Sequence, residues 1–496
     1  MMNLKCFSFI LLFFYSFGHS QIIDSFNYDF LQINQSEKLK LVMSKLNTIL
    51  KFSEQNNINN TDRQFSIVHF GDSHIQADYF SGAIRKILQS HFGEAGNGII
   101  FPYSLCKSYG PKGLESTATG KWNASNILMS KENNNIGIAG YALKTFDTIS
   151  KLKFQFNNKF SPASSETLKI WYSLDSSTTN FYLNDEFENV NNTQFESGWG
   201  IKTFKSRNII SGFDVSISQK VESPSGFSFL GFELDQPLKR GIKYNQCGVV
   251  GAQFSHLINN AKLVIPQLKY LAPDLIIFSF GTNEAYDKNI DSTKYFNELN
   301  KFFSQLNLIL PNTAIIITTA PDTRSQGRTP PNQININNQL IKISKTHDLS
   351  YFDLNRAMGG WGSLNDWHKN NLVSNDKLHF NASGYALQGK MFSLAFLENY
   401  NDNFKNDTIE IFNLKNEILN NLKSILIPKK NNIEEITNPL NIKPTSIKSP
   451  KIYVVKRGDT IYRIAQKFQV SGKKILLINN LKENSIIRPG QKIKLP

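Results

Sequence analysis

Short apolar runs rich in β-branched and aromatic residues recur along the chain, separated by amphipathic segments of helical length. The runs cover residues 65–70, 274–280, 314–319 and 349–354. A helical pattern from about Asp78 to Ser90 follows the first run. Apolar strands that alternate with helices are typical of a parallel sheet covered on both faces. The pattern therefore predicts an α/β fold.

Between about residues 105 and 245 the pattern changes to alternating apolar and polar positions between turns rich in Ser, Asn and Gly. The alternating runs are 168–173, 180–183, 213–218 and 227–232. Such alternation is typical of antiparallel strands with one buried face. We therefore expect a β-sandwich, residues 105–245, inserted into an α/β domain that occupies 21–104 and 246–400.

The C-terminal part of the chain has a looser pattern followed by a compact one. A helix is expected near 406–426, and we assign 401–450 as a linker because Lys, Asn and Pro dominate its second half. Residues 451–496 then show a strand, two short helices and a closing strand. In this unit Gly458-Asp459-Thr460 is expected to cap the first helix, and Pro489-Gly490 to turn into the last strand.

The N-terminus has the features of a secretory signal. Residues 1–20 contain Lys5, an apolar run over 7–17 and a small residue, Ser20, at the end. The run is too short for a membrane-spanning helix, and no other stretch reaches that length. We expect export to a periplasm or cell wall, or out of the cell, with no membrane span after signal removal.

The net charge of +15 favours polyanionic surroundings such as cell-wall polymers or lipid head groups. The basic residues are spread over the chain, and no nucleic-acid-binding motif accompanies them. We therefore expect no nucleic-acid partner.

Four short motifs contain the candidate chemistry. They are Gly71-Asp72-Ser73-His74, Gly248-Val249-Val250-Gly251, Gly281-Thr282-Asn283-Glu284 and Asp376-Lys377-Leu378-His379. Each has an ordinary structural explanation, such as a helix cap for Ser73 or a turn for Asn283, so only their joint occurrence favours a site. Ser73 and Asn283 each follow the end of a predicted parallel strand, where ligands bind in such sheets. The sequence therefore places the two residues at the same edge of the sheet.

The first and last motifs together fit nucleophilic catalysis. A serine hydroxyl is a poor nucleophile until a base takes its proton, and the base needs a partner that fixes its tautomer. Asp376 and His379 are three residues apart, which on a loop or first helical turn lets the carboxylate reach Nδ1 while Nε2 faces Ser73. A helix follows directly, and Asn381 or Ser383 is expected to cap it.

The order of the four motifs resembles that of the SGNH (GDSL-type) hydrolases, over residues 60–105 and 245–400. The resemblance implies a flavodoxin-like three-layer α/β/α domain with Ser73, Asp376 and His379 as its catalytic triad.

The same resemblance implies an oxyanion hole made by the backbone N–H groups of Ser73 and Gly251 and the side-chain amide of Asn283. Gly248 is the alternative to Gly251, which we prefer because it lies just before an expected helix. The family's usual Gly-x-Asn-Asp ends in Glu284 here. Each such donor is worth about 2.7–4 kcal/mol in serine hydrolases.

His74, His256 and His368 are rival candidates for the base. His368 follows Asp366 at a spacing of two, within a Trp-containing segment that suits substrate contact better. We therefore name His368 and Trp361 as candidate substrate contacts. No Cys, His and Asp cluster has the spacing of metal ligands, so we expect neither a metal nor another cofactor.

Two cysteines, Cys106 and Cys247, flank the predicted insert. The ends of an inserted domain usually lie close together, and disulfides form in exported proteins. The sequence leaves two alternatives open: a disulfide at the base of the insert, or two unpaired buried thiols.

Residues 453–495 resemble a LysM domain over nearly its whole length. That resemblance implies binding to N-acetylglucosamine-containing glycans, chiefly peptidoglycan; a unit that only contacts other proteins is the alternative. The whole arrangement resembles bacterial peptidoglycan O-acetylesterases, whose SGNH domain contains an inserted sandwich like a carbohydrate-binding module. We predict a secreted serine esterase that removes O-acetyl groups from peptidoglycan sugars through an acyl-serine intermediate.

Three alternatives to this function remain at the level of the sequence. An O-acetyltransferase would use the same triad, an esterase would act on another acetylated polysaccharide or a lipid, and a scaffold would bind glycan without catalysis.

Overall fold

The computed structural model describes residues 31–53, 64–129, 136–157, 160, 165–174, 180–196, 198–218, 226–236, 239–324, 330–404, 409–426, 451–455, 461–468, 472–479, 481 and 487–495. The chain divides into two compact units, Met1–Ile427 and Pro428–Pro496, each described by itself. The predicted signal segment, residues 1–20, lies outside the described residues. Within the described residues, no helix is both long and apolar enough to cross a membrane.

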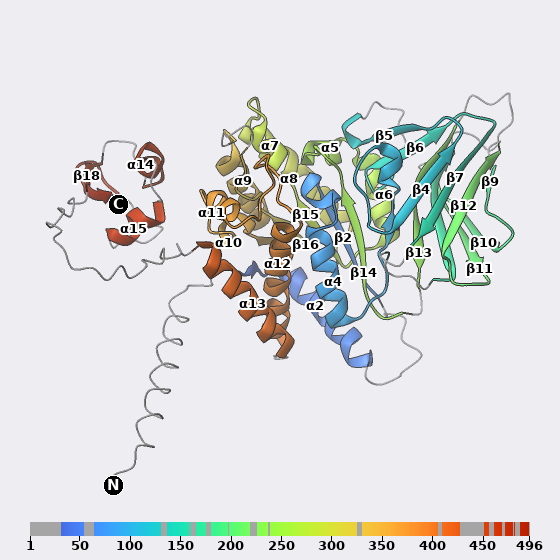
Figure 1. The fold of residues 1–496 in the computed structure, drawn as a ribbon, viewed down its shortest axis with the longest axis horizontal. Coiled ribbons are helices and arrows are strands. Elements are labelled where there is room, and N and C mark those ends of the chain that lie inside the picture. The colour runs from blue at the N-terminus through green and yellow to red at the C-terminus, as the bar shows by residue number, and fades with distance from the viewer. Residues whose placement is uncertain are drawn as a thin grey trace, which may run out of the picture. The chain divides into compact units, whose positions relative to one another are not determined.

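A mixed sheet forms the centre of the first unit (Figure 1). Its strands are β1 (Ile33–Asn34), β2 (Gln64–Gly71), β14 (Gly241–Gly248), β15 (Leu275–Ser279), β16 (Ala314–Thr318) and β17 (Ser350–Phe352). The spatial order is β1-β17-β16-β15-β2-β14, with β1 antiparallel at the edge and the others parallel. Counted along the chain, the parallel strands have the flavodoxin-like order 2-1-3-4-5. The chain order reverses between β2 and β15, which is where ligands bind in such sheets.

Helices cover both faces of this sheet because successive strand residues point to opposite sides. In β2, Phe65 and Ile67 pack with α2 (Glu37–Ser53), α4 (Phe80–Phe92) and α12 (Ala382–Phe404). Val68 and Phe70 of the same strand pack into a second core. That core includes α5 (Phe254–Asn259), α6 (Ala261–Leu271), α8 (Ser292–Ile309) and α9 (Gln333–Thr346). The predicted three-layer α/β/α fold is confirmed.

The predicted insert folds as two antiparallel sheets. The larger contains β3 (Ile99–Ile100), β5 (Asn123–Asn126), β6 (Tyr141–Thr145), β8 (Thr167–Leu174), β10 (Phe187–Gln194), β11 (Trp199–Ser206) and β13 (Phe227–Asp235). The smaller contains β4 (Leu114–Thr119), β7 (Ile149–Phe156), β9 (Asn180–Tyr182) and β12 (Gly212–Ser218). Phe154 of the smaller sheet packs on Phe229 and Phe232 of the larger, with ring centroids 5.5 and 5.2 Å apart. The two sheets therefore face each other as a sandwich.

The expected boundaries of the insert differ from those in the structure. Residues 241–245 were assigned to the sandwich, but they belong to β14, which pairs in parallel with β2 in the central sheet. The sequence of β14 includes the polar residues Lys243, Asn245 and Gln246, so it does not look like a buried strand of a parallel sheet, although most of its residues are buried. At the other end, β3 precedes residue 105 and pairs with β13 of the sandwich.

Both cysteines at the base of the insert are free thiols. Cys247 is buried in β14, and Cys106 is partly buried at the end of a short helix, η1 (Tyr103–Cys106). The disulfide considered from the sequence is therefore not formed, and the alternative of unpaired thiols is the one found.

The segment assigned as a linker begins with folded structure. Helix α12 continues to Phe404, and α13 covers Ile409–Leu426. The apolar side of α13 is buried in the same core as α12, with Ile418 and Leu422 fully buried. The predicted linker, 401–450, is therefore too long at its start, because the helix expected near 406–426 packs on the first unit.

The second unit has the predicted β-α-α-β order. It contains β18 (Lys451–Val454), α14 (Ile461–Phe468), α15 (Gly472–Ile478) and β19 (Lys492–Leu495), and its two strands pair antiparallel. At the turn into β19, Gly490 has a φ of +89° and Gln491 N–H donates to Arg488 O. This is the turn predicted from Pro489-Gly490, since a positive φ favours glycine there. The predicted cap at 458–460 lies outside the described residues.

Candidate active site

The first motif forms a tight turn between β2 and a one-turn helix, α3 (Ser73–Gln76). A Cβ on Gly71 would lie 2.2 Å from Ile75 Cγ1 and 2.8 Å from the carbonyl oxygen of Ser279. Only glycine fits this close approach of α3 and β15. Asp72 caps the helix by accepting a hydrogen bond from His74 N–H at 2.9 Å. Ser73 is thereby held at the carboxyl end of β2.

Ser73, His379 and Asp376 are joined by hydrogen bonds across more than 300 residues of sequence. Ser73 Oγ lies 2.9 Å from His379 Nε2, and His379 Nδ1 lies 2.7 Å from Asp376 Oδ2. The side chains of His379 and Asp376 are 34% and 50% exposed, so solvent and substrate can reach the pair. This is the arrangement in which an imidazole takes a proton from a serine hydroxyl.

A tight loop fixes the positions of Asp376 and His379 relative to each other. Lys377, between them, adopts a left-handed φ of +57°, which bends the chain back on itself. The backbone N–H groups of Leu378 and His379 both donate to Asp376 Oδ1 at 3.0 Å. Burial acts to raise the pKa of Asp376, but the hydrogen bonds from His379 and the two backbone groups outweigh it and lower that pKa. Asp376 is therefore an ionised carboxylate at neutral pH, where it accepts the hydrogen bond from His379 Nδ1.

The helix after this loop is capped as predicted. Asn381 Oδ1 accepts from the backbone N–H of Gly384 at 3.0 Å, at the start of α12. Asn381 is thus the capping residue, rather than the alternative, Ser383.

The loop after β14 brings Gly251 to the same rim. Gly251 has a φ of +78°, and its N–H has no hydrogen-bond partner among the described residues. Gly248, the alternative donor, is the last residue of β14, and a Cβ there would lie 2.4 Å from Gln76 N. Gly248 thus allows the close packing of α3 on β14, whereas Gly251 offers a free donor just before α5, where it was expected.

Asn283 lies in the first turn of α7 (Thr282–Tyr286), directly after β15. Its Nδ2 donates to Ala252 O at 2.9 Å and lies 3.4 Å from Asp72 Oδ2. The side-chain amide therefore contacts both the motif that contains Ser73 and the loop that contains Gly251. The structure brings the three predicted oxyanion donors to one edge of the sheet.

Glu284, where the family usually has Asp, joins two of these segments. Its Oε1 accepts from Phe254 N–H at 2.8 Å, and its Oε2 accepts from Gly281 N–H at 3.0 Å. Burial raises the pKa of Glu284 to about 7. Sequence reasoning missed this role. The sequence did contain a clue to it, namely a carboxylate directly after Asn283. A carboxylate that becomes buried has to accept hydrogen bonds, here from backbone N–H groups.

Two of the rival histidines are engaged elsewhere. His74 is buried, with Nδ1 2.8 Å from Tyr385 Oη, and burial lowers its pKa to about 3. The ring of His74 lies 5.4 Å from that of His379, centroid to centroid, but it makes no hydrogen bond to Ser73. His256 Nδ1 accepts from Gln253 N–H at 3.0 Å. The third rival, His368, is exposed at the end of a short helix, α11 (Leu364–Lys369).

The two candidate substrate contacts are not part of the hydrogen-bonded site. Trp361 is partly buried in a glycine-rich loop whose Gly362 N–H donates to Asp322 Oδ2. That loop adjoins the segment in which Arg324 N–H donates to Lys377 O, beside the acid and base. Among the described residues, no hydrogen bond or ring contact joins His368 or Trp361 to the triad, and both stay predictions as substrate contacts.

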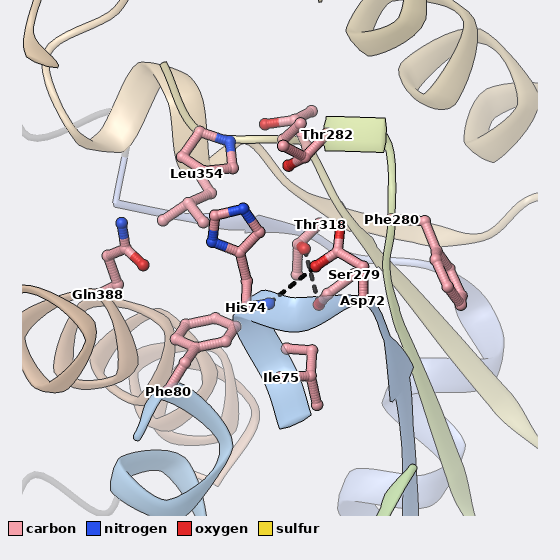
Figure 2. Close-up of a pocket in the computed structure, with 13 residues that line it drawn as sticks. Asp72, His74, Ile75, Phe80, Ser279, Phe280, Thr282, Thr318, Leu354 and Gln388 are labelled. Carbon is pink, nitrogen blue, oxygen red and sulfur yellow. Dashed lines mark hydrogen bonds between the residues drawn. The ribbon is translucent and has the colours of Figure 1, made fainter. Parts of the chain in front are cut away.

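A small pocket adjoins the first motif (Figure 2). Its lining includes Asp72, His74, Thr318 and Gln388, but not Ser73 or the acid and base. The His74 ring projects into it, and His74 Nε2 has no hydrogen-bond partner among the described residues. Burial also raises the pKa of Asp72 to about 8. At neutral pH the Asp72 carboxyl in this pocket is therefore protonated and the His74 ring is neutral.

Comparison with known proteins identifies two domains. A family model described as the GDSL-like lipase/acylhydrolase family matches residues 215–387, and one described as the LysM domain matches 453–496. The chain therefore contains a GDSL-like acylhydrolase domain, that is, an SGNH-type esterase domain, and a LysM domain. The first match includes Gly251, Asn283 and the Asp376–His379 segment, but it begins after Ser73. No protein of curated function matches the sequence significantly.

Solved structures with the same fold include a peptidoglycan O-acetylesterase, with a TM-score of 0.59 and 21% identity over 73% of this chain and 96% of that chain. A lipase/acylhydrolase from Enterococcus faecalis aligns at 22% identity over 31% of this chain and 75% of its own, with a TM-score of 0.26. An acetylxylan esterase from Geobacillus stearothermophilus aligns at 16% identity over 32% and 73%, with a TM-score of 0.25. At 21% identity, the likeness to the peptidoglycan O-acetylesterase is one of fold.

Proposed function

We propose that this chain, which contains an SGNH-type esterase domain and a LysM domain, is a secreted serine esterase that removes O-acetyl groups from peptidoglycan sugars. The observation that carries the proposal is the hydrogen-bond chain from Ser73 Oγ through His379 to Asp376, at 2.9 and 2.7 Å. The LysM domain supports a glycan built from N-acetylglucosamine as the substrate polymer. The fold shared with a peptidoglycan O-acetylesterase supports the acetyl ester.

In the proposed first step, Ser73 Oγ attacks the acetyl carbonyl while His379 Nε2 takes the hydroxyl proton. Asp376 holds the ring by Nδ1 and stabilises the imidazolium. The carbonyl oxygen becomes negative and accepts hydrogen bonds from the backbone N–H groups of Ser73 and Gly251 and from Asn283 Nδ2. The C–O bond to the sugar then breaks, and His379 returns the proton to the leaving sugar oxygen.

The second step removes the acetyl group from the enzyme. Water attacks the acetyl-serine carbonyl, His379 takes a proton from that water, and the same donors hold the oxyanion. The bond to Ser73 Oγ breaks, Oγ regains a proton from His379, and the product leaves as acetic acid, which ionises in water to acetate and a proton. Because His379 and Asp376 are partly exposed, water can reach the acyl group, which favours hydrolysis over transfer to a second sugar.

The test is acetate release from O-acetylated peptidoglycan by the full chain after signal removal. We expect Ser73→Ala to lower turnover by about 10⁶, as loss of such a nucleophile does in subtilisin. Ser44→Ala, on the exposed side of α2, is the matched control and should keep full activity. Equal acetate release by the Ser73 variant would contradict the proposal. If the chain cleaves an aryl acetate but releases no acetate from O-acetylated peptidoglycan, it is an esterase whose substrate is not peptidoglycan.

A further inference from the structure

Gln76 connects the segment that contains Ser73 with two other parts of the chain. It lies on the same helical turn, about 5 Å along the axis from Ser73, and is buried. Its Oε1 accepts from Val250 N–H at 2.8 Å, next to Gly251. Its Nε2 donates to Ser108 Oγ at 2.5 Å and to Tyr109 O at 3.2 Å. The first loop of the insert is thereby fixed beside the oxyanion loop.

Three apolar side chains around Gln76 are exposed to solvent. Tyr109 is 78% exposed, Val250 45% and Leu128 38%. Leu128 Cδ2 is 3.1 Å from the position that a Cβ on Gly251 would take, so it borders the oxyanion loop directly. Single exposed apolar residues are ordinary, but these three belong to segments that Gln76 and Gly251 bring together. We call Tyr109, Leu128 and Val250 the Gln76 rim.

The backbone under the rim is held in place by hydrogen bonds. Leu128 lies in a short helix, η2 (Ile127–Met129), whose Ile127 N–H donates to Gly140 O at 3.0 Å. Asn260 Nδ2, from the end of α5, donates to Ile127 O at 3.2 Å. Together with the bonds of Gln76, these contacts fix the rim before any ligand binds, which lowers the entropy cost of binding.

We propose that the Gln76 rim, with Tyr109 and Leu128 from the insert and Val250 from the loop after β14, is a glycan subsite of the active site, an inference that rests on the proposed function. The sugar rings next to the acetylated residue lie on Tyr109, Leu128 and Val250 while the acetyl group reaches Ser73. Ligand sites of this kind combine aromatic and aliphatic surface with a few polar groups. Because Leu128 borders Gly251, a polymer whose acetyl group lies at Ser73 can extend over the rim.

The size of the rim favours a glycan over a protein partner. A stable protein interface covers about 800 Å² on each side, far more than three side chains provide. A sugar ring has an apolar face of C–H groups and a polar edge, and it is small enough to be covered by one aromatic ring and its neighbours.

The test uses the full chain with signal removed, a short soluble O-acetylated glycan fragment and an aryl acetate. The quantity compared is the ratio of kcat/KM for the fragment to kcat/KM for the aryl acetate. We expect Tyr109→Ala to lower this ratio about 10-fold, through a higher KM for the fragment, as the loss of one well-packed aromatic contact does. Tyr109→Phe should keep the ratio, because it keeps the ring. Since Gln76 bonds the backbone of Tyr109, neither change removes that hydrogen bond.

Tyr182 supplies the matched control. It is 57% exposed and lies in β9, at the far edge of the smaller sheet of the sandwich. Tyr182→Ala should leave both substrates unaffected. A ratio unchanged in Tyr109→Ala, or lowered instead by Trp361→Ala alone, would overturn the subsite while the proposed function stands. A wild-type chain that cleaves the aryl acetate but no acetylated glycan would overturn the proposed function and the subsite together.

Discussion

At the scale of single residues, the acid of the candidate triad is unusual in being half exposed. An exposed carboxylate is screened by water and contributes little through charge alone. Here three hydrogen bonds fix Asp376 instead, from His379 Nδ1 and from two backbone N–H groups in its own loop. Its role is therefore to orient the imidazole and to select the tautomer in which Nε2 faces Ser73.

Asp376→Asn tests that role. An amide in this position can donate to Nδ1, which selects the wrong tautomer, so we expect kcat on an aryl acetate to fall by about 10⁴. Asp366→Asn is the control, because Asp366 is also partly exposed and paired with a cation, Lys369, but lies outside the site. A fall of less than tenfold in Asp376→Asn would show that His379 keeps its orientation without the carboxylate.

The buried carboxyl of Asp72 makes a prediction about stability and pH. Burial raises its folded-state pKa from 3.8 to about 8, so the folded protein binds the proton more tightly than the unfolded chain. Stability is then full below the unfolded pKa, near 4, and is lost as pH rises through about 8. Glu284, with a pKa raised to about 7, acts in the same direction.

We therefore expect the melting temperature of the wild type to fall between pH 5 and pH 8.5 by more than that of Asp72→Asn. The amide still accepts from His74 N–H through its oxygen but has no charge to bury. Asp402→Asn, at an exposed position near the end of α12, should follow the wild type. Parallel pH profiles for the wild type and Asp72→Asn would contradict a raised pKa for this carboxyl.

The residues that sequence reasoning found are those whose position follows from local order. Ser73 and Asn283 directly follow strands, and Asp376 and His379 share one loop, so their placement needed only the sheet rule and a short spacing. Gln76 was missed because its partners, Ser108 and Val250, come from distant segments. Contacts of that kind depend on packing that no local pattern reveals.

At the scale of elements, apolar content decided what could be predicted. The strands β15 and β16 are buried on both faces and were expected nearly to the residue. The expected boundary at residue 245 falls inside the edge strand β14, where polar residues such as Asn245 interrupt the apolar pattern. Asn245 is buried, and its side chain accepts from Ile99 N–H and donates to Ile67 O. A polar residue satisfied in this way does not look buried in the sequence.

Helix α13 gives the prediction at this scale. Leu422 is fully buried in the core shared with α12, whereas Phe412 of the same helix is 63% exposed. Removing buried methyl groups costs about 2–5 kcal/mol of stability, so Leu422→Ala should lower the melting temperature of the first unit clearly. Phe412→Ala should change stability by no more than about 0.5 kcal/mol. Equal effects of the two changes would mean that α13 does not pack on the first unit.

At the scale of the whole molecule, the chain joins a unit that contains the GDSL-like acylhydrolase domain to a separate LysM unit, which binds the glycan in the proposed function. The two form distinct compact bodies, divided after Ile427, and the second has its own small core that includes Ile464, Ile475 and Ile493. Tethering of this kind raises the local concentration of substrate at the active site without a new contact. The benefit is confined to polymeric substrates that the second unit can hold.

Two truncations separate these contributions. A chain that ends at Ile427 keeps α13, and we expect it to cleave an aryl acetate as the full chain does but to bind and deacetylate insoluble peptidoglycan more weakly. A chain that ends at Tyr400 loses α13 and exposes the surface of α12 that Ile418 and Leu422 cover, so it should melt at lower temperature and lose aryl acetate activity on mild warming. Binding to insoluble peptidoglycan by sedimentation, aryl acetate kinetics and thermal melting distinguish the two.

Two outcomes would contradict these expectations. Undiminished binding to peptidoglycan by the chain ending at Ile427 would assign glycan targeting to the first unit. An intact melting transition in the chain ending at Tyr400 would support the longer linker that the sequence predicts.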